Sequence, residues 1–341
     1  MNRMAIAYPF PEPPAPGTVL SVARGILWLR MPLPFQLDHI NLWLLQDGPG
    51  WTIVDTGLGL DDTRALWERL FRDCLDGRPV TRVVVTHFHP DHMGNAEWLT
   101  SRWQTELWSS EGEWRTASAV HQISEANFDA RVARIRQHGA DEDAIEKLKH
   151  RRGHYLKLVP TIPSTFRRLR DGDALTIDGQ RWEVLTVQGH SPEHACLWSA
   201  EAGVLISGDQ VLPKITTNVS VSPEQPSTNP LRLYLASLAR FQPMAPDTLV
   251  LPSHGLPFQG LHERLAQLRQ HHELRLSEIL DALVEPQSVA ELLPKVFRRA
   301  LDAHQLGFAF GEALSHLHFL EAEGRVERVI GADGVHRFRK V

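Results

Sequence analysis

Three histidines and one aspartate lie within six residues of the sequence: His87, His89, Asp91 and His92. They follow a β-branched run, residues 82–86, that predicts a buried strand. Pro90 fixes φ and lacks an N–H, so we expect a loop at the carboxyl end of that strand, where α/β sheets place their ligands. In an extended loop the first two histidines can point the same way, while the aspartate and the third histidine turn toward a second point. The spacing indicates a cradle for two metal ions; the alternative is a polar surface loop that is rich in histidine.

Four further polar motifs lie along the chain: Val54-Asp55-Thr56-Gly57, Gly189-His190-Ser191, Ser207-Gly208-Asp209 and Ser253-His254-Gly255. Together with the segment 86–94, THFHPDHMG, they resemble the motifs of the metallo-β-lactamase superfamily, in the order of that family, over residues 18–260. The resemblance implies an α+β fold, the four-layer αββα sandwich of the superfamily. The resemblance places Asp209 at the position that bridges two metals in the superfamily. An aspartate at this position is similar to glyoxalase II and other thioesterases of the superfamily.

The resemblance also implies a ligand set for two metals. The first metal would be bound by His87, His89 and His190, the second by Asp91, His92 and His254, and Asp209 would bridge both. This mixture of imidazole and carboxylate suits zinc, so we expect two zinc ions per chain, although iron and manganese accept the same ligands. Asp55 would accept a hydrogen bond from the ring N–H of a ligand histidine that does not face the metal, and such a bond fixes the tautomer of the histidine. The alternative is that Asp55 caps the helix that follows.

Two residues are candidates for roles in the reaction itself. By the resemblance, Asp91 would orient an attacking hydroxide while it binds the second metal. His194 lies four residues after His190 and would donate to a substrate oxygen, or would occupy a supporting position in the core. His39, close to Asn41, is expected to be structural.

The activity expected from such a site is hydrolysis. Two ions that share a water lower its pKa toward neutrality, and the hydroxide attacks a carbonyl ester, with an acyl-CoA-like thioester preferred. The alternatives are a lactone or phosphodiester substrate, iron-dependent oxidation of a persulfide, and a binding module without activity. Antibiotic hydrolysis is not expected, because the zinc β-lactamases have cysteine or histidine where Asp209 stands. Quorum-signal lactonases have a tyrosine close after the bridging aspartate, where this chain has Gln210.

The elements that must position these residues are mainly strands, since each proposed ligand lies just past the end of one. Strands are expected at 19–30, 40–45, 51–54, 82–86, 106–108, 174–177, 181–187, 195–199, 204–207 and 248–251. Asp178-Gly179 predicts a tight hairpin between two of them. Helices are expected at 61–75 and 95–102.

Residues 110–165 are strongly charged and predict an insertion of two helices, roughly 117–138 and 141–152, with Asp141 as a possible N-cap. A basic cluster lies near its end: Lys147, Lys149, Arg151, Arg152 and Lys157, with His150, His154 and Tyr155 among them. The functional hypothesis is a lid over the metal cleft that recognises an acidic substrate. The alternative is a solvated helix face.

Residues 261–341 predict a small separate module. A helix at 262–283, a second capped by Ser288 with Glu291 in the capping-box position, a third at 310–323, and strands at 326–330 and 335–339 resemble a winged helix. The module carries 11 Lys and Arg against 12 Asp and Glu, and its third helix carries no Lys or Arg. Phosphate contacts need basic side chains, so no nucleic acid is expected, and we interpret the module as a packing or homodimer element.

Composition sets the outer bounds. With 341 residues, 42% hydrophobic and 23% charged, the chain is typical of a globular protein of one or two domains. The net charge of −5 gives no reason to expect nucleic acid or an anionic membrane as a partner. The partner expected from the proposed hydrolysis is a small-molecule substrate. Cys74 and Cys196 form neither a disulfide framework nor a CxxC site. Residues 1–17 predict an extended proline-rich arm without the features of a signal peptide, and a cytoplasmic location is expected.

Overall fold

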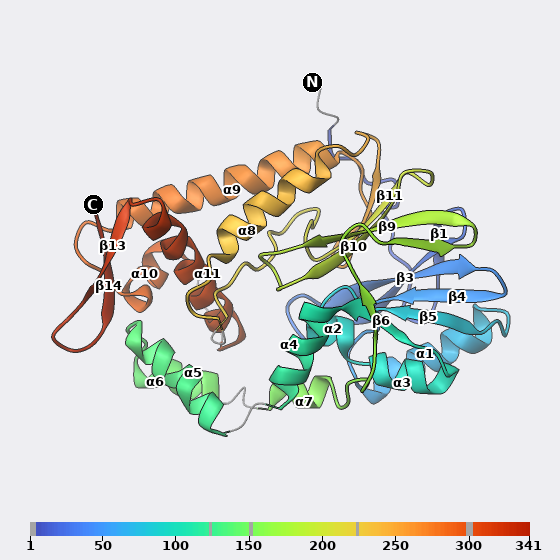
Figure 1. The fold of residues 1–341 in the computed structure, drawn as a ribbon, viewed down its shortest axis with the longest axis horizontal. Helices are drawn as coiled ribbons and strands as arrows, with labels where there is room; N and C mark the ends of the chain where they lie inside the picture. Colours follow the sequence, from blue (N-terminus) through green and yellow to red (C-terminus); the bar gives the residue numbers. More distant parts are fainter. Residues whose placement is uncertain (1–4, 123–124, 150–152, 223–224, 298–302) are drawn as a thin grey trace. The chain divides into compact units, whose positions relative to one another are not determined.

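The computed structural model describes residues 5–122, 125–149, 153–222, 225–297 and 303–341 (Figure 1). Their internal contacts divide the chain into two compact units. The first comprises Met1–Gln122, His154–Thr217 and Phe241–Leu265; the second comprises Ile123–Gly153, Asn218–Arg240 and Ala266–Val341. Each unit is therefore assembled from three stretches of chain, and the expected boundaries at residues 18 and 261 stay predictions.

Seven strands form one sheet of the first unit, in the order in which they occur in the chain. They are β1 Leu20–Ala23, β2 Ile26–Pro32, β3 His39–Asp47, β4 Gly50–Val54, β5 Val80–Val84, β6 Leu107–Ser110 and β7 Arg167–Leu169. Neighbouring strands are antiparallel from β1 to β4 and parallel from β4 to β7. Val54 and Val84 are register partners, so β4 and β5 end side by side.

Five strands form the second sheet, in the order β12-β11-β10-β9-β8. They are β8 Ala174–Ile177, β9 Gln180–Val187, β10 His194–Ser199, β11 Val204–Gly208 and β12 Leu249–Pro252. The expected hairpin joins β8 and β9, with Asp178 and Gly179 both at positive φ. The strands β11 and β12 are parallel, with Gly208 opposite Pro252, so they too end side by side.

The two sheets pack face to face through one apolar core. Trp28 and Trp43 of the first sheet stack with ring centroids 6.2 Å apart, and Trp182, Leu197 and Ile206 of the second sheet belong to the same buried cluster. On β3 the residues alternate, because Trp43 and Leu45 face this core while Leu42 and Leu44 face away from it. A strand buried on both faces needs a continuous apolar run, which is what residues 42–45 supply.

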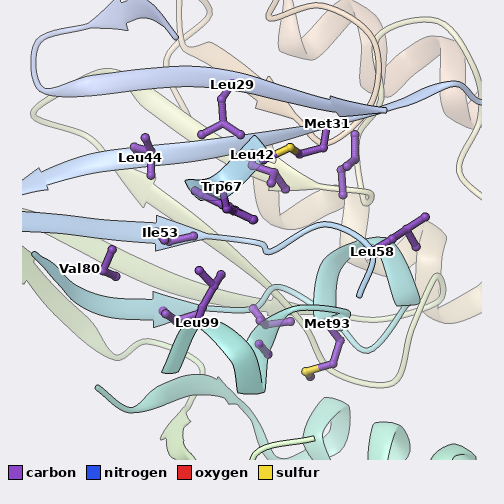
Figure 2. Packing of buried hydrophobic residues seen from close by; sticks show 14 of the residues in the cluster. Leu29, Met31, Leu42, Leu44, Ile53, Leu58, Trp67, Val80, Met93 and Leu99 are labelled. Atoms are coloured by element: carbon purple, nitrogen blue, oxygen red, sulfur yellow. The ribbon is translucent and has the colours of Figure 1, made fainter. Parts of the chain in front are cut away.

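Helices cover the outer face of the seven-stranded sheet. Trp67 of α1 (Asp61–Asp73) and Leu99 of α3 (Ala96–Trp103) belong to one cluster with Leu42, Leu44 and Ile53, as Figure 2 shows. Trp67 is completely buried, and its Nε1 donates to the carbonyl oxygen of Thr56 at 2.9 Å. The helix layer is thereby attached to the loop that follows β4.

The second unit is mostly helical. Its elements are α5 Glu125–Gln137, α6 Glu142–Lys149, α8 Pro230–Ser237, α10 Val289–Val296, α11 Ala303–Ala322, β13 Val326–Ile330 and β14 His336–Lys340. Two elements run from one unit into the other: η1 Leu238–Phe241 and α9 Leu261–Ala282. Ser288 and Glu291 form the predicted capping box on α10, and β13 pairs with β14 as expected. Three helices and a hairpin are present in the C-terminal residues, and their likeness to a winged helix stays a prediction.

The helical insertion differs from the prediction. It forms four helices, α4 Glu111–His121, α5, α6 and α7 His154–Leu158, rather than two, and only its middle part belongs to the second unit. There α6 contacts α11, and the N–H of Ala290 donates to the carbonyl oxygen of His138 at 3.2 Å. The described residues 125–149 are therefore part of the same packing as the C-terminal residues.

Of the basic cluster in the insertion, Lys147 pairs with Asp143 and Lys149 with Glu146, all of them exposed. Lys157, also exposed, belongs to α7 in the first unit. His150, Arg151 and Arg152 lie outside the described residues. The two pairs fit the alternative of a solvated helix face, and the lid stays a prediction.

Two local predictions were wrong for identifiable reasons. The expected strand at 19–30 is two strands, because Gly25, at φ +71°, makes a turn between β1 and β2. The expected loop after His89 begins with a one-turn helix, α2 Pro90–Met93, because proline is well suited to the first position of a helix. In the part of the chain that the structure describes, no helix is long and apolar enough to cross a bilayer.

The packing predicts the cost of removing Trp67. Trp67→Ala should lower the free energy of unfolding by about 3–5 kcal/mol, because a fully buried indole leaves a cavity between α1 and the sheet. The matched control is Trp98→Ala, because Trp98 lies on the same cluster but is only partly buried. Urea unfolding at 25 °C measures both variants. Equal losses for the two would contradict the assigned packing.

Candidate metal centre

The proposed ligands and the neighbouring Asp55 lie where strands of both sheets end. Asp55 follows β4 and His87 follows β5, while Asp209 and His254 follow the adjacent strands β11 and β12. His190 lies in the turn between β9 and β10. Because β4 with β5 and β11 with β12 are parallel, their carboxyl ends present these side chains at common edges. The fold thus brings residues separated by up to 199 positions to one place.

Four side chains form the first group: His87, His89, His190 and Asp209. His87 Nε2 lies 2.9 Å from His89 Nδ1 and 3.1 Å from His190 Nε2. Asp209 Oδ2 lies 3.5 Å from His190 Nε2 and 4.0 Å from His87 Nε2. Zinc bonds of about 2.0–2.1 Å in a tetrahedron place nitrogen ligands about 3.3 Å apart. The four atoms therefore have the spacing of ligands around one ion.

Three side chains form the second group: Asp91, His92 and His254. Asp91 Oδ2 lies 3.6 Å from His92 Nε2 and 3.4 Å from His254 Nε2. The other carboxylate oxygen of Asp209, Oδ1, lies at 3.6 Å and 3.4 Å from the same two nitrogens. One carboxylate thus presents Oδ2 to the first group and Oδ1 to the second.

The buried polar atoms of the two groups fit metal ions. Among the described residues, His92 Nε2 and Asp209 Oδ1 are buried without a hydrogen-bond partner. Such atoms are costly unless something satisfies them. A cation between Asp209, His92 and His254 would satisfy both atoms at once.

Electrostatics keep the first group in a form that can bind a metal. Burial and the neighbouring imidazoles lower the pKa of His87 well below its usual value and that of His89 to about 3. Both rings are therefore neutral and offer a lone pair. Burial acts to raise the pKa of Asp209, but the imidazoles of His254 and His92 outweigh it and hold that pKa well below the ordinary range. The shared carboxylate is ionised.

The ring nitrogens that face away from the site are held by other groups. The partners are Thr86 Oγ1 for His87 at 3.1 Å, Asp55 Oδ2 for His92 at 2.8 Å, Thr217 Oγ1 for His190 at 2.9 Å and the His39 carbonyl for His254 at 2.8 Å. Such contacts fix the tautomer and the orientation of a ligand histidine. Four of the five histidines are therefore oriented from behind.

Asp55 joins the loop after β4 to the loop after β5, which carries four of the proposed ligands. Its backbone lies in the left-handed region, at φ +64°, which aspartate tolerates better than most residues. Its carboxylate accepts the N–H of Thr86 at 2.8 Å and faces His92 Nδ1. The alternative expectation, that Asp55 caps the next helix, does not hold, because the N-cap of α1 is Leu60.

The loop that carries His254 is held by β3. Asn41 donates its backbone N–H to Ser253 and its side-chain amide to the carbonyls of Pro252 and Gly255, all within 2.9 Å. His39 accepts the N–H of Gly255 on Nε2 at 2.9 Å. His39, expected to be structural, therefore contacts the site from behind His254.

His194 is completely buried beside His87, with ring centroids 4.8 Å apart. Its Nε2 accepts the backbone N–H of Asp209 at 3.2 Å. Gly208, at φ +54°, allows this approach, because a Cβ there would overlap the His194 ring. These contacts favour the supporting position over donation to a substrate oxygen, since the acceptor nitrogen is already used and the ring has no exposed surface.

Two contacting residues were missed from the sequence. Thr217 holds His190 but follows it by 27 positions in a segment without a pattern. Glu113 is completely buried and accepts hydrogen bonds from the loops on both sides of the first group. The spacing Ser110–Glu113 has the form of a capping box, so it predicts a helix start and conceals the second use of Glu113.

Comparison with known proteins agrees with this architecture. The model of the metallo-beta-lactamase superfamily matches residues 36–254, and the model of a metallo-beta-lactamase-like C-terminal domain matches residues 276–341. A solved beta-lactamase domain protein from Burkholderia ambifaria is 50% identical, with a TM-score of 0.92 over 98% of both chains. The family protein TTHA1429 from Thermus thermophilus is 30% identical, with a TM-score of 0.80 over 94% of this chain and all of its own.

More distant relatives have names that state an activity. The probable metallo-hydrolase YqjP of Bacillus subtilis is 24% identical over 88% of this chain and 93% of its own length. The acyl-coenzyme A thioesterase MBLAC2 of Bos taurus is 26% identical over 56% of this chain and 65% of its own. The atrochrysone carboxyl ACP thioesterase of Aspergillus fumigatus is 23% identical over 82% and 71%.

The geometry around Asp55 predicts a selective loss. Asp55→Asn keeps a residue that tolerates positive φ, but its amide NH₂ must oppose the N–H of Thr86 or the ring N–H of His92. We expect metal affinity of the second group to fall about 10- to 100-fold, as for other outer partners of ligand histidines. Competition with a chelator measures the affinity. The control is Asp61→Asn on α1, an exposed carboxylate outside the site; an equal loss in both variants would contradict the role of Asp55.

Proposed function

Because the chain belongs to the metallo-beta-lactamase superfamily, and its relatives are metal-dependent hydrolases, we propose that it binds two zinc ions and cleaves a carbonyl ester, preferably a thioester. The two-ion proposal rests on the position of Asp209, whose two carboxylate oxygens face different groups of histidines. Its Oδ2 belongs to the group of His190, at 3.5 Å, and its Oδ1 to the group of His254, at 3.4 Å. A carboxylate that faces both groups in this way can bridge two adjacent ions.

The chemistry of the donors supports zinc. The two groups together offer five imidazoles and two carboxylates and no thiolate among the described residues. That mixture suits zinc and also accepts iron and manganese. When bound, two such ions lower the pKa of a shared water and polarise a substrate carbonyl.

The residues of this chain do the remaining work. Asp91 faces His92 and His254 through Oδ2, and its pKa is lowered to about 2, because these imidazoles outweigh the effect of burial. An ionised Asp91 can hold and orient an attacking water. Ser191 donates its hydroxyl to Glu113 at 2.7 Å and is buried, so it is occupied and does not serve as a nucleophile.

The preference for a thioester comes from two lines of support. MBLAC2 and the atrochrysone carboxyl ACP enzyme are thioesterases by name. Asp209 at the bridging position is similar to the thioesterases of the superfamily rather than to its antibiotic-hydrolysing members. Both lines concern the class of bond that is cleaved, and we extend them to this chain as a proposal.

Metal content tests the proposal directly. We expect elemental analysis of protein purified without chelator to find two zinc ions per chain. His89→Ala and Asp209→Ala should lose metal, because each removes a direct ligand, with a loss of affinity larger than the about 10- to 100-fold typical of outer partners. His121→Ala is the matched control and should keep both ions, because His121 is a partly exposed histidine on α4 outside both groups. One iron per chain would instead support persulfide oxidation.

A substrate panel tests the class of bond. Zinc-loaded protein should release thiol from an acyl-CoA thioester with a kcat/KM at least tenfold above its rates on a lactone and a phosphodiester. Thiol release is followed by a chromogenic disulfide, and the other two reactions by product chromatography. The Asp209→Ala variant serves as the blank. Faster cleavage of the lactone or the phosphodiester would overturn the thioester preference.

A further inference from the structure

One buried carboxylate connects the two loops that carry the histidines of the first group. Glu113 Oε2 accepts the backbone N–H of Phe88 at 3.0 Å. Glu113 Oε1 accepts the hydroxyl of Ser191 and the backbone N–H of Glu193, both at 2.7 Å. Glu113 has no exposed surface. Two loops that are about 100 residues apart in the sequence thus share one acceptor.

The bonded positions are next to the ligands. Phe88 lies between His87 and His89, and its N–H belongs to the peptide bond that follows His87. Ser191 directly follows His190. Three hydrogen bonds to Glu113 therefore hold the loop of His87 and His89 and the loop of His190 at a fixed distance from each other. Among the described residues, no comparable bond runs from Glu113 to the second group.

The helix that carries Glu113 is itself locked to the second loop. Ser110, the N-cap of α4, donates its hydroxyl to the carbonyl of Glu193 at 2.6 Å, and the Glu193 carboxylate accepts the N–H of Gly112 at 2.6 Å. A Cβ on Gly112 would come within 2.8 Å of the Glu193 side chain, so the contact needs glycine. Glu113 is therefore held on a rigid support.

The Phe88 peptide is held from its other side as well. Tyr155 of α7 donates its hydroxyl to the Phe88 carbonyl at 2.7 Å. The N–H of Phe88 points to Glu113 and its carbonyl to Tyr155. Both polar groups of the residue between the two ligands are thus satisfied by side chains from the segment 111–158.

We propose that Glu113 is a positioning residue that sets the affinity of the first metal group without contacting the metal, and that Tyr155 assists it. The inference rests on the proposed two-metal function. The backbone N–H groups of Phe88 and Glu193 can only donate, and each faces a different oxygen of Glu113. Both terminal atoms of the side chain must therefore accept, which a carboxyl group allows and an amide does not. If one of these buried donors lost its acceptor, the loop that carries it would shift until the donor reached another acceptor.

Glu113→Gln is the decisive variant. In either orientation the amide NH₂ of glutamine opposes a backbone N–H, that of Phe88 or that of Glu193. We expect one of the two ions to bind about 10- to 100-fold more weakly and the other to bind as in the wild type. Titration with Co²⁺, read by its visible absorption and by competition with a chelator, measures both affinities and the geometry of each site.

Double variants assign the loss to one group. With His254→Ala, which leaves only the first group intact, Glu113→Gln should lower the affinity of the remaining ion about 10- to 100-fold. With His89→Ala, which leaves only the second group intact, Glu113→Gln should change nothing. Equal losses in both backgrounds, or none in either, would overturn the proposal, because a purely structural role would affect both groups alike.

Two further variants complete the test. Glu111→Gln is the control, because Glu111 lies on the same helix but its carboxylate pairs with Arg115 and Arg168 at the surface; it should bind both ions normally. Tyr155→Phe removes only the bond to the Phe88 carbonyl and should weaken the first ion in the same direction as Glu113→Gln. If Glu113→Gln does not fold, an unchanged Co²⁺ titration of Tyr155→Phe overturns the proposal. A wild-type protein that takes up no second ion refutes the proposed function instead, independently of Glu113.

Discussion

Seven polar side chains that would repel or desolvate one another are gathered at the junction of two apolar sheets, and the Asp209 carboxylate lies at their centre. Its two oxygens face different groups of imidazoles, at 3.4–3.6 Å on one side and 3.5–4.0 Å on the other. Burial acts to raise the pKa of this carboxyl, but His254 and His92 outweigh that effect and keep the pKa low. A buried carboxylate needs partners that offset the cost of its burial, and the first unit places the ligand side chains around it.

That support is built in layers. Stacked tryptophans and aliphatic side chains between the sheets fix the strand ends, and α1 and α3 close the outer face of the larger sheet. Polar contacts then lead inward from this frame: Trp67 to the loop after β4, Asp55 from that loop to His92, and Asn41 to the turn that holds His254. Four of the five ligand histidines are oriented by partners outside the two groups, so small errors in the frame would be passed directly to the site.

The sequence was most informative where chemistry and periodicity coincide. His87 could be found because an apolar run predicts a strand and reactive residues follow strand ends. Asp209 was assigned by the family resemblance, and its place after a predicted strand supported that assignment. Other features leave no local trace. Glu113 has the spacing of a capping box, which hides its bonds to Phe88 and Ser191, and Thr217 depends on a loop path that no pattern specifies. Pro90 indicated an interruption but equally suits the first turn of a helix. The insertion is divided between the two units, with α4 and α7 in the first and α5 and α6 in the second. This division depends on tertiary packing, because the sequence of a charged amphipathic helix does not indicate which element it will pack against.

The discontinuous make-up of the second unit bears on how the protein is synthesised. Residues 123–153 leave the ribosome well before α11, which α6 contacts and which begins at Ala303. At about 5–20 residues per second, the roughly 150 intervening residues take about 8 to 30 seconds to make. During that time the apolar side chains of the insertion, such as Ile145, which is fully buried in the finished protein, lack their final neighbours. The first unit must therefore complete its sheets while the insertion still lacks the C-terminal residues that it packs against. A chain that ended at Leu265 would never supply those residues.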